Sequence, residues 1–245
     1  MPLHLPPAQP FGPLGRLSLS LFVAASGALL LVFLAFPGLD LAVSGLAFDP
    51  VGGFTLRDDP GIEAVRRTLW RFGLAMLGIA LAMTCLHPWR KAARLWPTRV
   101  WVFIVVLSVS GPGLLVNGVL KSFWGRARPR EITEFGGSAA YSAPFQIVDA
   151  CQSNCSFVSG EAAGAAVVGL SLVILAHGTR SPALRAAALV AGPAVAVVVA
   201  ALRVAVGAHF LSDVVFAAIL MWALAEILAR FIPLGGTCES RQTRS

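Results

Sequence analysis

The chain has 245 residues, of which 57% are hydrophobic and 13% are charged, and its mean hydropathy is +0.78. A soluble globular domain carries about 25% charged residues, and a disordered chain combines low hydrophobicity with high charge, so the composition excludes both classes. The formal net charge of +7 would suggest nucleic acid as the partner of a soluble protein, whereas in a membrane protein basic residues collect in cytoplasmic loops.

Six apolar runs are each long enough to cross a bilayer, which takes about 20 residues in a helix. They cover residues 17–36, 69–86, 100–120, 157–176, 186–206 and 212–232. The first is longer than the core of a signal peptide and is not followed by a small-x-small cleavage site, so we interpret it as a retained helix. The sequence therefore predicts an all-α fold, with one integral membrane domain (1–245) built as a six-helix bundle between short tails, 1–16 and 233–245.

The distribution of basic residues predicts the orientation of this bundle. Six helices leave both termini on one side, and the loops 87–99 and 177–185 on that side contain Lys and Arg but no acidic residue. The positive-inside rule therefore assigns the termini to the cytoplasm and the other loops to the outside, which in a bacterium is the periplasm. We expect a multi-pass protein of the bacterial inner membrane. The net charge follows from this topology and does not indicate nucleic acid.

Two cysteines, Cys151 and Cys155, fall on an outward loop, where a disulfide can persist. Their spacing permits a bond without dictating one, so two free thiols remain the alternative. A metal site is disfavoured, because no second Cys or His pair accompanies them.

His209 is the one histidine expected on the outer side, and Asp213 follows it by four residues. If the sixth helix begins here, the two side chains share one face, and the carboxylate could orient the imidazole and leave its other nitrogen free to attack. An interfacial helix cap with an incidental histidine is the alternative interpretation.

Cations gather at the end of the third run, where a solvated charge cluster or nonspecific headgroup binding is the ordinary explanation. They are Lys121, Arg126, Arg128 and Arg130. The positive-inside rule disfavours basic residues on this face, so a specific anion is the better explanation, and guanidinium groups match phosphate oxygens.

The fourth run begins near Ser159, Gly160 and Glu161. The amides at a helix N-terminus form an anion site, although simple capping by Ser159 and helix packing through Gly160 and Gly164 would also explain these residues. Glu161 is an ionisable residue at a membrane helix and is therefore a functional candidate.

Three segments, taken in order, resemble the motifs of the type 2 phosphatidic acid phosphatase (PAP2) superfamily of membrane lipid phosphatases. The family pattern is Lys-x6-Arg-Pro, then Pro-Ser-Gly-His, then Ser-Arg-x5-His-x3-Asp. Segment 121–129 matches the first motif in full, and segment 202–213 matches the third with Leu202 where Ser is usual. Segment 158–161 reads Val-Ser-Gly-Glu, so both Pro and His of the second motif are replaced.

This resemblance implies hydrolysis without metal or cofactor through a phosphohistidine, with His209 as nucleophile and Asp213 as its orienting partner. It implies that the phosphate is bound by Lys121, Arg128, Ser159, Gly160 and Arg203. In the family, the histidine of the second motif protonates the leaving group. Here Glu161 would have to act as that acid and later as a base that activates water, or the chain works without an acid.

The expected substrate is a lipid phosphate in the outer leaflet: lipid A 1-phosphate, undecaprenyl diphosphate, phosphatidylglycerophosphate or phosphatidic acid. The glutamate variant and the cysteine loop are most similar to bacterial lipid A 1-phosphatases. A lipid phosphotransferase using the same site and a non-catalytic lipid-phosphate-binding protein remain alternatives. Membrane lipids are the expected partners, and the sequence indicates neither nucleic acid nor an obligate protein partner.

Overall fold

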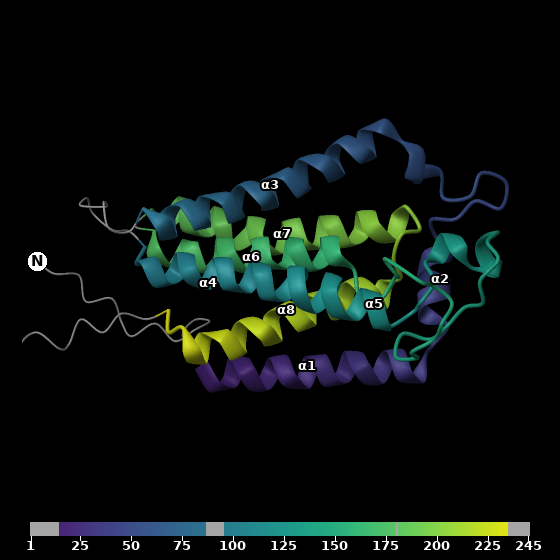
Figure 1. The fold of residues 1–245 in the computed structure, drawn as a ribbon, viewed down its shortest axis with the longest axis horizontal. Coiled ribbons are helices and arrows are strands. Elements are labelled where there is room, and N and C mark those ends of the chain that lie inside the picture. The colour runs from purple at the N-terminus through teal and green to yellow at the C-terminus, as the bar shows by residue number, and fades with distance from the viewer. Residues whose placement is uncertain (1–14, 87–95, 180, 235–245) are drawn as a thin grey trace, which may run out of the picture.

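The computed structural model describes residues 15–86, 96–179 and 181–234, and within them the fold is all-helical (Figure 1). Most of both predicted tails and most of the 87–99 loop lie outside the described residues. The long helices run side by side along one axis. They are α1 (Gly15–Ala35), α3 (Pro60–Cys85), α4 (Thr98–Ser108) with its continuation, α6 (Gly160–Gly178), α7 (Pro182–Ala205) and α8 (Leu211–Phe231).

Within the described residues, five helices are long and apolar enough to span a membrane, which confirms a multi-pass helical membrane protein. One span is composite, because α4 continues through a π-helical stretch (η3, Val109–Leu120) into α5 (Lys121–Phe123). Residues 19–35 of α1 pass the same test only together with the short helix α2 (Leu39–Gly45), toward which the chain bends by 85°.

The predicted start of the second span at residue 69 is wrong, because α3 begins at Pro60. Asp59 caps this end by accepting a hydrogen bond of 2.8 Å from the Ile62 N–H, and Pro60 occupies the first turn, where its missing N–H costs nothing. The added turns are polar and carry Arg66 beyond the apolar run. This extension brings α3 into the site described below.

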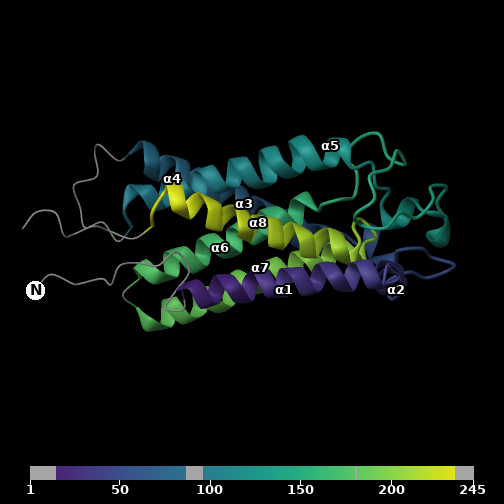
Figure 2. The same cartoon turned by 90° about the horizontal axis from the view of Figure 1, so that it is seen from below.

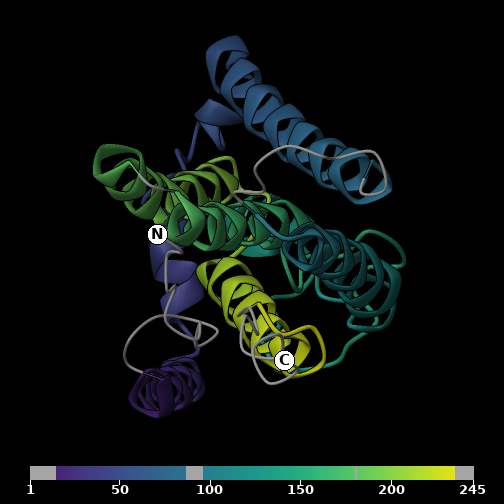
Figure 3. The same cartoon turned by 90° about the vertical axis from the view of Figure 1, so that its left-hand side faces the viewer.

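Helix α6 is the central element, and α3 stands on the opposite side of it from α1 (Figure 3). Its tightest neighbour is α7, because a Cβ built on Gly169 would lie 2.6 Å from the carbonyl oxygen of Gly192, and one built on Gly192 would lie 2.7 Å from that of Gly169. The backbones therefore touch where both helices lack a side chain. The close-packing glycine is thus Gly169 and not Gly164, whose Cβ position has no neighbour within 4 Å.

The connections at one end of the bundle carry all three sequence motifs. The long segment between α5 and α6, the short helix α2 and the α7–α8 turn lie together there, as Figures 1 and 2 both show. The starts of α1, α4 and α7 lie at the opposite end. Residues far apart in sequence are therefore gathered at one membrane face.

Candidate active site

Three chain segments meet at the loop end: the end of α5, the start of α6 and the turn between α7 and α8. The last is sharp, because Gly207 adopts a φ of +62° and a Cβ there would lie 2.4 Å from the ring of Phe54. Only glycine fits this turn. Its geometry places His209 just before the first turn of α8.

His209 is buried, with 2% of its surface exposed, and its Nδ1 lies 2.8 Å from the carbonyl oxygen of Ser156. A carbonyl only accepts hydrogen bonds, so Nδ1 carries the proton and Nε2 keeps its lone pair. Burial lowers the pKa of His209 to about 4, although Asp213 opposes this shift. The imidazole is therefore neutral at physiological pH, as a nucleophile must be.

Asp213 acts on His209 mainly through a third residue. Its Oδ2 accepts a hydrogen bond of 2.5 Å from the Ser156 hydroxyl and one of 2.9 Å from the Phe210 N–H, whereas Nδ1 of His209 lies 3.7 Å away. His209 and Asp213 do lie close together at the start of α8, on the same side of the helix. Ser156, which sequence reasoning did not single out, links the carboxylate to the carbonyl that holds the imidazole.

Arg126 belongs to the cationic cluster but is fully buried below it. Its Nη1 lies 2.7 Å from Asp213 Oδ1, and its Nη2 lies 2.8 Å from Oδ2 of the buried Asp40 in α2. Burial disfavours its charge, but the carboxylates of Asp213 and Asp40 outweigh this and raise the pKa of Arg126. Arg126 is thus a structural clamp that ties α2 to the start of α8. Asp40, an acidic residue in an apolar stretch, was a signal the sequence analysis missed.

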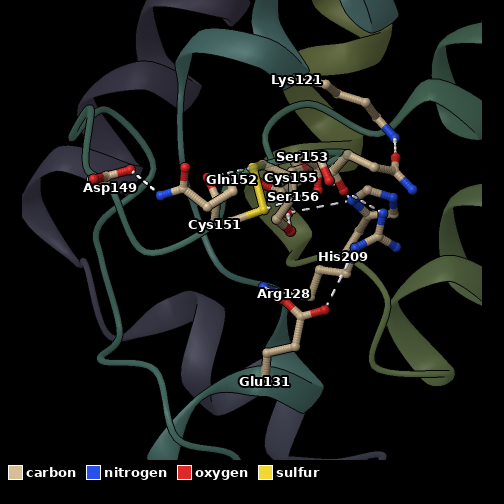
Figure 4. Close-up of a disulfide and its surroundings, with 12 residues drawn as sticks. Lys121, Arg128, Glu131, Asp149, Cys151, Gln152, Ser153, Cys155, Ser156 and His209 are labelled. Atoms are coloured by element: carbon tan, nitrogen blue, oxygen red, sulfur yellow. Dashed lines mark hydrogen bonds and ion pairs between the residues drawn. A yellow bond between two sulfur atoms is a disulfide. The ribbon is translucent and has the colours of Figure 1, made fainter.

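Lys121 and Arg128 both bond to one residue, Asn154. Figure 4 shows the two cations beside the loop that contains Cys151 and Cys155. The Lys121 Nζ donates to the Asn154 side-chain oxygen at 2.8 Å, and the Arg128 Nη2 donates to the Asn154 backbone oxygen at 2.7 Å. Asn154 adopts a left-handed φ of 50° inside the short loop that a disulfide between Cys151 and Cys155 closes. Its two neutral oxygens accept hydrogen bonds from Lys121 and Arg128, and the charged oxygens of a phosphate would accept stronger ones from the same donors.

Ser159 and Gly160 form the N-terminus of α6. The buried Ser159 caps the helix, its Oγ accepting from the Ala162 N–H at 3.3 Å. A Cβ on Gly160 would lie 2.8 Å from the Asn117 side-chain oxygen, so a larger residue here would displace that side chain. The Ser159 cap is compatible with the predicted anion site, because the other amides at this helix end can still bind an anion.

Glu161 lies between two guanidinium groups. Its Oε1 is 3.0 Å from the Arg66 Nη1 and 3.6 Å from the Arg203 Nη1. Arg66 was missed because the polar start of α3 was not recognised as helix. Among the described residues, the buried Nε of Arg203 has no hydrogen-bond partner.

The fold and this site indicate the class of protein to which the chain belongs. The PAP2 superfamily model matches residues 99–234, and the chain belongs to that superfamily of membrane lipid phosphatases. It is a phosphoric monoester hydrolase.

The chain is 35% identical over 233 residues to a lipid A 4'-phosphatase of Rhizobium leguminosarum, with 88% of this chain and 94% of the relative covered. A lipid A 4'-phosphatase of Rhizobium etli is 34% identical over 205 residues, covering 76% of each chain. The crystal structure of a transmembrane PAP2 type phosphatidylglycerolphosphate phosphatase from Bacillus subtilis shares the fold, with a TM-score of 0.55 at 21% identity and with 86% of this chain and 96% of that one covered.

Proposed function

We propose that the chain hydrolyses a phosphate monoester of lipid A in the outer leaflet of a bacterial inner membrane. The observation that carries this is the likeness to two relatives named lipid A 4'-phosphatase along nearly the whole length of one of them. It favours the 4'-phosphate over the 1-phosphate that the motif resemblance suggested. The basic inner loops support an orientation with both termini in the cytoplasm and the site facing the periplasm.

In this proposal the Nε2 of His209 attacks phosphorus, the bond to the sugar oxygen breaks, and that oxygen takes up a proton. Water then attacks the phosphohistidine, which releases inorganic phosphate and restores the neutral imidazole. Ser156 and Asp213 keep the ring oriented throughout. The charge of the transition state is stabilised by donors that converge on the phosphate. These are Lys121, Arg128, Arg203, Ser159 and the N–H of Gly160.

An assay that identifies which phosphate group is removed tests the proposed substrate. Purified protein in detergent, with a chelator present, is incubated with lipid A bearing both phosphates, and the products are resolved by mass spectrometry. We expect loss of the 4'-phosphate as free phosphate, faster than release from phosphatidic acid, phosphatidylglycerophosphate or undecaprenyl diphosphate. Faster turnover of any of these three, or of the 1-phosphate, would overturn the proposal. Transfer of the phosphate to another lipid would identify a phosphotransferase.

Glu161 is proposed to act as a base in the second step. Its carboxylate is paired with Arg66 and Arg203, and it can accept a proton from water once bound phosphate draws Arg203 away. Replacing Glu161 with Gln should slow turnover by roughly 10²- to 10⁴-fold. With radiolabelled lipid A, phosphoenzyme should accumulate because only its hydrolysis is slowed.

The result separates the roles considered for this residue. Slow formation of phosphoenzyme in the Gln variant would assign Glu161 to the acid role. A rate near that of the unmodified protein would remove Glu161 from the mechanism.

A further inference from the structure

A polar cavity of about 230 Å³ opens beside the phosphate-binding residues. It is lined by Arg66, Trp70, Asn117, Lys121, Gly160 and Glu161. Two of these, Lys121 and Gly160, belong to the proposed phosphate site, so the cavity adjoins the phosphate directly. His209 and Ser156 do not line it. The cavity therefore lies on a side of the phosphate site that the nucleophile does not occupy.

The position of the cavity assigns it to the leaving group. In phosphoryl transfer the attacking and leaving atoms lie roughly in line on opposite sides of phosphorus. With His209 on one side, the alcohol part of the substrate has to extend to the other, where Glu161 and Arg66 line the wall. The mechanism described above gives no role to Trp70 or Asn117, so their presence beside the phosphate site favours a ligand there.

The chemistry of the lining indicates the kind of alcohol. Trp70 offers an aromatic surface with 48% of the residue exposed, while Asn117 provides an amide and the Arg66–Glu161 pair provides donors and acceptors. A pyranose ring has apolar C–H faces that pack on an aromatic ring and hydroxyl groups that need such polar partners. We propose that this cavity is the subsite for the sugar ring that bears the scissile phosphate. This assignment rests on the proposed function.

A second cavity continues the first into the membrane region. Its volume is about 220 Å³, it lies between α3, the π-helical stretch, α6 and α7, and it shares Arg66, Trp70, Asn117 and Glu161 with the polar cavity. The rest of its lining is mostly apolar, with side chains such as Leu74 from α3. A polar subsite that opens into an apolar one has the layout of a glycolipid, in which acyl chains extend from the sugar.

Two substitutions in α3 test the subsite. Trp70→Ala should raise the KM for lipid A at least tenfold, because the ring loses its apolar platform. It should leave inhibition by orthovanadate, which needs only the phosphate-binding residues, within twofold of the unmodified protein. Phe72→Ala is the matched control, since Phe72 lies on the same helix, is 44% exposed and lines neither cavity. An unchanged KM in Trp70→Ala, or equal effects of both variants, would overturn the subsite.

A competition experiment keeps this inference separate from the proposed function. A dephosphorylated glucosamine lipid should inhibit hydrolysis of whichever lipid phosphate the protein turns over, whereas diacylglycerol with matched chains should not. Trp70→Ala should abolish that inhibition. If lipid A is not hydrolysed but the sugar lipid still competes selectively, the function fails and the subsite stands; equal inhibition by both neutral lipids refutes the subsite itself.

Discussion

Replacing His209 with alanine should abolish phosphate release from lipid substrates, with a loss on the order of 10⁴-fold or more, as is typical when a nucleophile is removed. The reason lies in the hydrogen bond between Nδ1 and the Ser156 carbonyl, which leaves Nε2 as the basic nitrogen in a buried ring. Alanine removes the attacking atom and leaves the cations in place. The measurement is free phosphate from purified protein, together with trapping of radiolabelled phosphoenzyme after acid-free quenching.

The control for this variant is His177→Ala. His177 is exposed at the far end of α6 and its Nδ1 lies 2.7 Å from the Val173 carbonyl oxygen of its own helix, so its removal should leave the rate unchanged. Vanadate should still bind to His209→Ala, though more weakly, because the donors remain. Substantial turnover in His209→Ala, or a phosphoenzyme formed without His209, would show that the nucleophile is a different residue.

The second large effect is expected at Arg126, where methionine should lower stability by about 3–5 kcal/mol and inactivate the protein. The substitution preserves side-chain length but leaves the carboxylates of Asp40 and Asp213 buried side by side without their cation. The thermal unfolding midpoint in detergent measures the loss. Arg57→Met, at an exposed position in the short helix η1 (Thr55–Asp58), should leave the midpoint nearly unchanged.

A double variant shows whether charge is the cause. Adding Asp40→Asn to Arg126→Met removes one of the two uncompensated carboxylates, so part of the lost stability should return. A midpoint for Arg126→Met that equals that of Arg57→Met would contradict the clamp. A double variant less stable than Arg126→Met would show that the damage comes from packing and not from charge.

The sequence predicted the spans and the motif-bearing residues because both depend on local patterns. Apolar runs identify membrane helices through their length, and the spacing between His209 and Asp213 places both at the start of α8. The polar start of α3 was missed because it lacks an apolar run, although Asp59-Pro60 ahead of Glu63 is a helix-start pattern that could have been recognised.

The contacts that complete the site could not be predicted from the sequence, for a different reason. Asp40 and Arg126 are 86 residues apart, and Arg66 and Glu161 are 95 apart, so each pair depends on how the helices pack. Asn154 is similar: nothing in the order Cys-Gln-Ser-Asn-Cys indicates that its oxygens meet Lys121 and Arg128. Local rules do not carry information over such separations.

The clamp between Asp40 and Arg126 joins a residue outside the range matched by the family model to one inside it. Residues 99–234 contain every motif, yet they omit Asp40, the second carboxylate bound by Arg126, and both Arg66 and Trp70. A fragment trimmed to the matched region would keep the motif residues and the Arg126–Asp213 pair but lose the contact that ties α2 to the start of α8. The matched region therefore contains the motifs, whereas Arg66 and Trp70, which line the proposed sugar subsite, belong to the part of the chain that precedes it.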